Sequence, residues 1–322
     1  MDVTFLNVGY GESIVITEKE HCIVIDGGSA DSATYAGNTS IRIGAFLRWQ
    51  KISHIDLMIV THVHDDHIGG LVELANEFEI GKICVNIPPI CGISEHLAPY
   101  HDLLCASHSD CLFYAALLSY EQLLTVAKNR KIPVEAVCGE SKPISVGSIV
   151  LTPIGMTQKQ MEAEQEAFLA MLCEEDASQM AARYRALDAH CNATSLAFHV
   201  REGQCAALLS GDRVNGWDAF DGQRRLHANI LKLTHHGQKD GIPEAMVHAA
   251  MPEAFVICAD QDRTYDSAHP DVIQKACDYL RSNSLPERVF VTGNLQDDGG
   301  PACAVRFTLT SHAGITGITM LH

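Results

Sequence analysis

The sequence lacks any apolar run of about 18 residues, the length that a helix needs to cross a bilayer, so no membrane span is expected. Residues 1–6 (MDVTFL) have neither the cationic region nor the long apolar stretch of a signal peptide. The 12 cysteines form no CxxC pair, and several, such as Cys22 and Cys258, lie in apolar runs where a free thiol packs as a small hydrophobe. We therefore predict a reduced, cytoplasmic protein, with a secreted disulfide-rich protein as the alternative.

Basic residues are scarce: the sequence has 23 Lys and Arg but 40 Asp and Glu, which gives a net charge of −17 at pH 7. This balance argues against an extended basic surface for DNA. The 17 histidines are an unusual excess, and since histidine is the commonest metal ligand they favour metal binding. The cations near the motifs described below are scattered, at Arg213, Arg224, Arg225, Lys232 and Lys239.

Strand-like and helical patterns are interspersed along the chain, which favours an α+β fold. Short apolar runs predict strands at 3–8, 13–17, 22–26, 55–61, 82–87, 134–152, 195–200, 206–210, 230–234, 255–259, 289–292 and 304–309. Helical spacing of apolar residues predicts helices at 41–49, 68–78, 112–127 and 270–280. We predict one elaborated domain over 1–322, with helical insertions at about 90–132 and 157–189, the second forming surface helices.

The strongest chemical signal is the motif His62-x-His64-x-Asp66-His67, directly after the apolar run 55–61. Alternate residues of an extended segment point the same way, so His62 and His64 are expected to bind one ion together. Asp66 and His67, at the start of the next helix, are expected to face a second ion. Imidazole and carboxylate ligands suit Zn²⁺, Mn²⁺ or Fe. The alternative is a polar helix cap that happens to contain histidines.

The segment 61–70 (THVHDDHIGG) resembles the signature of the metallo-β-lactamase-fold superfamily. Further motifs narrow the resemblance to the soluble hydrolase domain of ComEC-type competence (DNA-uptake) proteins: FLNVGYGESIVI at 5–16, IVIDGG at 23–28, NATSL at 192–196, LSGD at 209–212, LKLTHHG at 231–237 and HP at 269–270. The resemblance implies an αββα sandwich with one or two divalent metal ions (Zn or Mn, with Fe as a further alternative) and a hydrolytic activity.

By the same resemblance, Asp212 is expected to bridge the two ions, and either His235 or His236 to bind the second. Asp26 is expected to orient a ligand histidine. The superfamily supplies a third histidine to the first ion, whereas this sequence has Asn192 in the aligned place, as ComEC-like members do, with His190 as a nearby substitute. The first ion is therefore expected to be weakly held, or absent, in the resting protein.

Two further features have open alternatives. His269, before Pro270, is a candidate to contact a substrate oxyanion or, with whichever of His235 and His236 is not a ligand, to protonate a leaving group; otherwise it is a plain helix-entry residue. A tract rich in Cys and His is either a structural zinc site or ordinary surface and core: Cys91, His96, His101, Cys105, His108 and Cys111.

These observations predict a metal-dependent hydrolase in which Asp66 and Asp212 help to hold a metal-activated water. The resemblance favours a phosphodiester in a nucleotide or a short nucleic acid. A small ester, lactone, thioester or β-lactam is the alternative within enzymes. A hypothesis of another class is a catalytically degenerate metal-binding adaptor that contacts partners through its two insertions.

Overall fold

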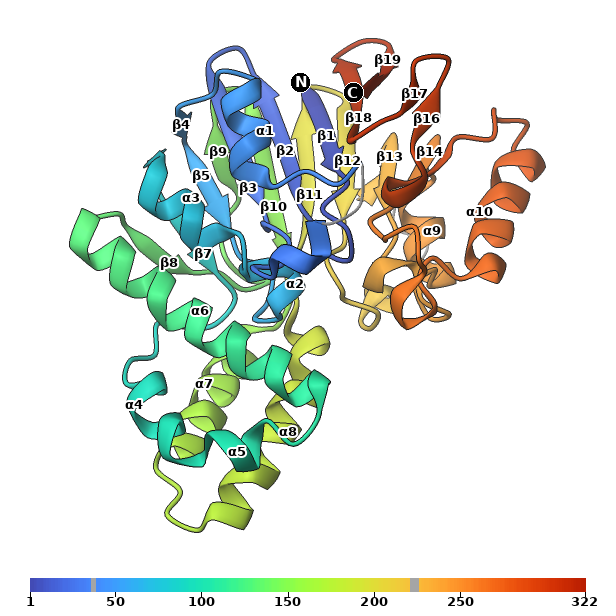
Figure 1. Cartoon of the computed structure of the whole chain (residues 1–322). Coiled ribbons are helices and arrows are strands. Elements are labelled where there is room, and N and C mark those ends of the chain that lie inside the picture. Colours follow the sequence, from blue (N-terminus) through green and yellow to red (C-terminus); the bar gives the residue numbers. More distant parts are fainter. Residues whose placement is uncertain (36–38, 221–225) are drawn as a thin grey trace.

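Two β-sheets packed face to face, with helices on their outer faces, form the body of the protein (Figure 1). The computed structural model describes residues 1–35, 39–220 and 226–322, so Arg224 and Arg225 lie outside the described residues. Among the described residues, no helix combines the length and the apolar character that crossing a bilayer requires. The predicted α+β sandwich is confirmed.

The first sheet has eight strands in the order β19-β18-β1-β2-β3-β5-β7-β8. Its N-terminal strand β1 pairs with β2 on one side and with the late strand β18 on the other, both antiparallel, whereas β3, β5, β7 and β8 are mutually parallel. The strands are β1 (Asp2–Leu6), β2 (Ile14–Glu18), β3 (His21–Ile25), β5 (Leu57–Ile59), β7 (Ile83–Val85), β8 (Val134–Ala136), β18 (Ala304–Thr310) and β19 (Gly314–Leu321).

The second sheet has seven strands in the order β15-β14-β13-β12-β11-β10-β9, antiparallel from β9 to β12 and parallel from β12 to β15. Its strands are β9 (Ile144–Val146), β10 (Ile149–Ile154), β11 (Ala197–Glu202), β12 (Cys205–Leu209), β13 (Ile230–Lys232), β14 (Ala254–Ile257) and β15 (Val289–Val291). Two short pairs complete the strands: β4 (His54–Ile55) with β6 (Glu79–Ile80), and β16 (Gln296–Asp297) with β17 (Gly300–Pro301).

Apolar side chains of both sheets interdigitate between them, and examples are Phe5 and Phe307 from the first sheet and Phe198 and Val256 from the second. The outer face of the second sheet is covered by α9 (Glu244–Ala250) and α10 (Pro270–Ser282). In each sheet the loops after the parallel strands leave from the carboxyl ends of those strands, which is where ligands bind in parallel sheets.

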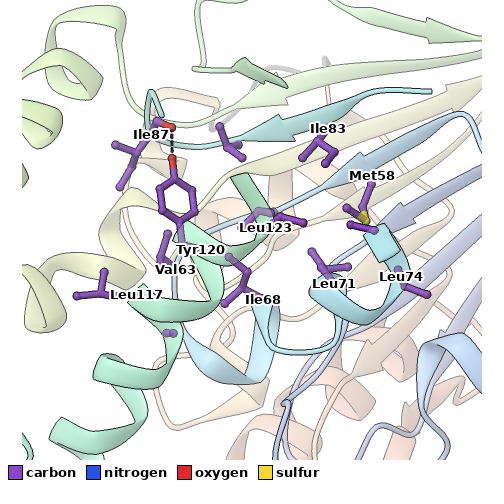
Figure 2. Packing of buried hydrophobic residues seen from close by; sticks show 14 of the residues in the cluster. Met58, Val63, Ile68, Leu71, Leu74, Ile83, Ile87, Leu117, Tyr120 and Leu123 are labelled. Atoms are coloured by element: carbon purple, nitrogen blue, oxygen red, sulfur yellow. Dashed lines mark hydrogen bonds between the residues drawn. The ribbon is translucent and has the colours of Figure 1, made fainter. Parts of the chain in front are cut away.

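The outer face of the first sheet is covered by α1 (Ile43–Trp49), α2 (Asp65–Ile68), α3 (Leu71–Glu77) and the long helix α6 (His108–Arg130). Figure 2 shows Leu117, Tyr120 and Leu123 of α6 within this layer, and the Tyr120 hydroxyl donates a hydrogen bond to the Ile87 carbonyl at 2.9 Å. The helix predicted over 68–78 is interrupted at Gly69 and Gly70. The Gly70 backbone packs directly on Gly27, and a Cβ at Gly70 would overlap the Gly27 carbonyl oxygen.

The two predicted insertions form one layer, which we call the helical cap. It consists of α4 (Ile93–Leu97), α5 (His101–Leu104), the first turns of α6, α7 (Gln158–Leu172) and α8 (Ala177–Thr194) (Figure 1). The rings of Phe113 and Tyr184 lie 5.1 Å apart, and the Tyr184 hydroxyl bonds to the Asp110 carbonyl. The second segment forms two surface helices, as the sequence predicts, and their apolar faces pack against the first segment, a contact that the sequence did not predict.

Candidate metal centre

The turn after β5 carries the histidine cluster. The chain leaves β5 at Ile59, and the backbone brings His62 to a fully buried position. His64, the N-cap of α2, also has extended backbone. His62 Nε2 lies 3.1 Å from His64 Nδ1, so the two rings present one nitrogen each to the same point. This is the arrangement that the alternate spacing of the motif predicts.

A second group of ligand atoms forms where α2 meets the turns after β12 and β13. His236 Nε2 lies 3.0 Å from Asp66 Oδ2, and 3.2 Å from both Asp212 Oδ2 and His67 Nε2. His67 Nε2 lies 3.6 Å from Asp66 Oδ2 and 3.5 Å from Asp212 Oδ2. Four ligands held about 2.0–2.2 Å from one tetrahedral ion are roughly 3.3–3.6 Å apart. The donor set therefore fits a divalent cation such as Zn²⁺.

Asp212 lies between the two groups. Its carboxylate also lies within 4.8 Å of ligand atoms of His62 and His67, and its buried Oδ1 accepts no hydrogen bond. A buried ionised oxygen needs a cation near it; the Lys232 ammonium lies 3.7 Å from Oδ1, and Oδ2 faces His67 and His236. The position fits the bridging role that the resemblance implies for Asp212.

The structure does not bring His190 to His62 and His64, which form the first group of ligand atoms. Its side chain is 58% exposed and its Nδ1 lies 3.0 Å from Glu164 Oε2, on the outside of the cap. Asn192 instead lines the site, with Nδ2 3.1 Å from His235 Nε2 and a buried Oδ1 that has no partner. Both residues belong to α8, which continues to Thr194, and residues two apart on an α-helix point about 200° apart. The prediction of His190 as a ligand is therefore wrong.

Buried acceptors orient the ligand rings. Asp26 accepts hydrogen bonds from the Thr61 backbone N–H at 2.9 Å and from the Thr61 hydroxyl at 2.6 Å, and its Oδ2 lies 2.7 Å from His67 Nδ1. His236 Nδ1 lies 2.7 Å from the Cys258 carbonyl oxygen. In both rings this contact leaves Nε2 facing the carboxylates, which is how proteins present histidine to a metal.

Asp188, which the sequence did not mark, orients a ligand from the cap. Its Oδ1 lies 3.2 Å from His64 Nε2, so His64 is left to offer Nδ1 to the site. A single acidic residue on a helix has no spacing that distinguishes it from a solvated surface residue. Only the packing of α8 against the site identifies it.

In the turn after β13, the neighbouring residues His235 and His236 have different surroundings. His236 is fully buried within the second group, whereas His235 bonds to Asn192 and, through Nδ1 at 3.0 Å, to Asp240. Both residues have left-handed backbone, with φ of 51° for His235 and 50° for His236, which is uncommon outside glycine. His235 lines the open pocket, so of the two it is the one placed to face a substrate.

His269 serves the fold rather than the site. It is the N-cap of α10, where its Nδ1 accepts a hydrogen bond from the Asp271 N–H at 3.1 Å, and its Nε2 lies 3.4 Å from Asp266. It does not line the pocket described below. The expectation that it contacts a substrate oxyanion or protonates a leaving group does not hold, and the helix-entry alternative describes it.

The tract rich in Cys and His shows no metal cluster among the described residues, which include all of 91–111. Its members take separate roles: His96 bonds to the Gly92 carbonyl, His101 lies beside Asp102, and Cys111 contacts the Cys105 carbonyl. Its helices belong to the cap, so the alternative of ordinary surface and core residues describes this tract.

The charges of the second group are tightly coupled. Burial alone would lower the pKa values of His67 and His236, but the carboxylates of Asp212 and Asp66 raise the pKa of His67 well above its usual value and that of His236 to about 9. Burial opposes ionisation of Asp212, yet the two imidazoles hold its pKa well below the usual range. Without a metal the group thus retains protons, which a cation would displace.

The metal-free protein is expected to lose stability as the pH rises from about 6.5 to about 9. A histidine with a folded pKa near 9 contributes stability that is complete below its unfolded value of 6.5 and is lost as the pH passes the folded value, on the order of 3 kcal/mol for His236. Thermal unfolding in excess chelator across this range measures the effect. The His236→Gln variant should show a flatter profile, and a wild-type stability that rises with pH would contradict the expectation.

A pocket of about 700 Å³ opens above the ligand groups. The cap contributes Phe113 and Asn192 to its wall, and the opposite wall carries Tyr10, whose ring lies 4.8 Å from that of His236 and 5.0 Å from that of Tyr265. None of its described lining residues is Lys or Arg. The lining contains many aspartates: Asp31, Asp65, Asp66, Asp188, Asp212, Asp260 and Asp262.

Comparisons with known proteins agree with this architecture. Residues 6–87 match the family model described as the metallo-beta-lactamase superfamily. A search of curated proteins finds no match. The chain has the metallo-beta-lactamase fold, whereas none of these comparisons points to the ComEC type, which stays a prediction from the motifs.

Three similar solved structures are remote in sequence. A metallo-beta-lactamase fold protein from Bacillus subtilis is 11% identical, over 90% of this chain and 96% of that one, with a TM-score of 0.43. An isothiocyanate hydrolase from Delia radicum gut bacteria is 11% identical over 97% and 100%, with a TM-score of 0.45. The short form of human tRNase Z is 14% identical over 90% and 93%, with a TM-score of 0.37.

Proposed function

We propose that this protein is a metal-dependent hydrolase of small molecules. The observation that carries the proposal is the group of Asp66, His67, Asp212 and His236 at the floor of an open pocket, in which each imidazole Nε2 lies 3.0–3.6 Å from both carboxylates. When bound there, divalent ions lower the pKa of a coordinated water and polarise the scissile group. Asp26 and the Cys258 carbonyl keep the ligand rings of His67 and His236 turned toward that position.

The first group of ligand atoms, from His62 and His64, supports an additional ion that is held more weakly than the ion of the second group. It offers His62 Nε2 and His64 Nδ1, with Asp212 shared, and Asn192 stands where the superfamily has a further histidine. His235 lies at the pocket wall between Asn192 and Asp240, and we assign it the transfer of the proton on Nε2 to the leaving group. To leave that proton on Nε2, Asn192 would turn its unpartnered Oδ1, in place of its Nδ2, toward this nitrogen. The hydrogen bond of His235 to Asp240 fixes which nitrogen faces the pocket.

The charge of the pocket favours a neutral or cationic substrate with a hydrolysable carbonyl. Even with Asp66 and Asp212 neutralised by metal, other aspartates remain in the lining and no described lining residue is Lys or Arg. Away from the ions, whose own positive charge attracts anions, these carboxylates disfavour a polyanion such as a nucleic acid. The phosphodiester substrate, which rests on the ComEC-type resemblance, becomes the alternative that the same experiment tests.

A substrate panel tests the proposal. Zinc- or manganese-loaded protein is expected to turn over p-nitrophenyl acetate or a lactone with a higher kcat/KM than bis-p-nitrophenyl phosphate, and to leave single-stranded DNA intact. His62→Ala should abolish the activity found, and retained activity would reveal a contaminant. Turnover of only the phosphodiesters would restore the nuclease hypothesis. Stoichiometric metal without any turnover would favour the adaptor.

A further inference from the structure

A fully buried ion pair joins the two sheets behind the metal centre. Glu12 lies in the loop between β1 and β2 of the first sheet, and Lys232 is the last residue of β13 in the second. Both side chains are 0% exposed, and the Lys232 ammonium contacts the Glu12 carboxylate directly. Taking two opposite charges out of water costs more than their attraction commonly returns, so stability alone is a weak reason for such a pair.

The lysine end of the pair holds the turn that carries Asp212. Lys232 Nζ donates a hydrogen bond to the Gly211 carbonyl at 2.9 Å and lies 3.7 Å from Asp212 Oδ1. The Asp212 N–H is fixed in turn by the Ser195 hydroxyl at 3.1 Å. Lys232 therefore contacts both the backbone and the carboxylate of this turn.

The glutamate end holds the turn that carries Asp66. The Glu12 backbone N–H donates to the Asp66 carbonyl at 3.0 Å, and the Glu12 carbonyl accepts from the Gly28 N–H at 2.9 Å. The pair thus connects two metal-binding carboxylates that come from different sheets, one through a backbone contact at Glu12 and the other through the ammonium of Lys232.

We propose that Glu12 and Lys232 are positioning residues that set the separation of Asp66 and Asp212 across the two sheets. The inference rests on the proposed function, because that function supplies the metal whose ligands are positioned. Neither residue faces the pocket, so neither is expected to contact substrate. An ion pair suits this task because contact between the two charged groups fixes their distance and direction, whereas apolar packing tolerates small shifts.

The alternative is a pair that matters only for folding, and a double substitution separates the two roles. Lys232→Met alone leaves Glu12 buried without a partner, and Glu12→Leu alone does the same to Lys232, so both single variants are expected to unfold more readily. Glu12→Leu/Lys232→Met replaces both charges with apolar groups of similar length. Its stability should recover toward that of the wild type, whether or not the single variants fold.

Metal affinity is the deciding measurement. Zn²⁺ alone is titrated against a chromophoric chelator into wild type, the double variant and the control Lys82→Met, which removes an ion pair with Glu135 far from the site. The double variant is expected to bind Zn²⁺ about 10- to 100-fold more weakly than wild type, the usual effect of losing a group that supports metal ligands. Lys82→Met should bind as wild type does.

Two outcomes would overturn the inference, and they are distinguishable. If the stable double variant binds Zn²⁺ within about twofold of wild type, the pair serves folding only, and the proposed function stands. If the wild type itself binds no Zn²⁺ or Mn²⁺ at the centre, the proposed function fails and the positioning role fails with it.

Discussion

His236→Ala is expected to lose the tightly bound metal and to lower kcat/KM by more than about 100-fold, whereas His235→Ala retains the metal. His236 Nε2 contacts Asp66, Asp212 and His67, so its removal opens one side of the ligand group. Losing a group that merely supports a ligand already costs about 10- to 100-fold in affinity or activity. The His235 side chain instead bonds to Asn192 and Asp240, which are not in the ligand group. Its loss should therefore lower kcat alone.

The neighbouring residues form a matched pair for this experiment, since they share one turn and one side-chain type. Metal content by mass spectrometry and kcat/KM on the best substrate of the panel are measured for both variants. Circular dichroism verifies that each is folded. Equal loss of metal in the two variants would contradict the assignment of His236 as the ligand.

Gly70→Ala is expected to destabilise the protein by more than about 3 kcal/mol, at the upper end of overpacking effects. An added methyl group would overlap the Gly27 carbonyl oxygen, and its nearest neighbours are all backbone atoms of Gly27, so no flexible side chain can move aside. Because α2, which carries Asp66 and His67, ends immediately before this glycine pair, relief of the overlap would also displace metal ligands.

Gly317→Ala in β19 is the control, because a Cβ there meets only Thr308 at an ordinary 3.6 Å. Chemical unfolding compares the free energies of both variants with wild type, and Zn²⁺ titration follows the site. A Gly70→Ala protein as stable as Gly317→Ala would show that the loop of Gly27 can retreat at little cost.

The sequence predicts the part of the site whose ligand residues are close together in the chain. His62, His64, Asp66 and His67 lie within six consecutive positions after an apolar run, and the structure places all of them at the site. Which of His235 and His236 can bind the metal depends on the left-handed backbone of this turn. The sequence cannot show this, because both residues are histidine.

Residues that act across the fold escape prediction for a physical reason. Lys232 interrupts an apolar run, where a lysine usually reaches solvent, and Asp188 resembles any acidic residue on an exposed helix. Their partners, Glu12 and His64, lie far away in sequence. The helical cap is a similar case, because each of its two segments has an apolar face whose partner is the other segment.

The pairing of β1 with β18 has a consequence for biosynthesis. The ribosome delivers β1 long before β18, although Val3 and Phe5 are fully buried in the finished sheet. While the intervening chain is translated, β1 can pair with β2, but its other edge stays unpaired. The nascent polypeptide therefore exposes an open strand edge until β18 is made, and such an edge is a site for association between nascent chains.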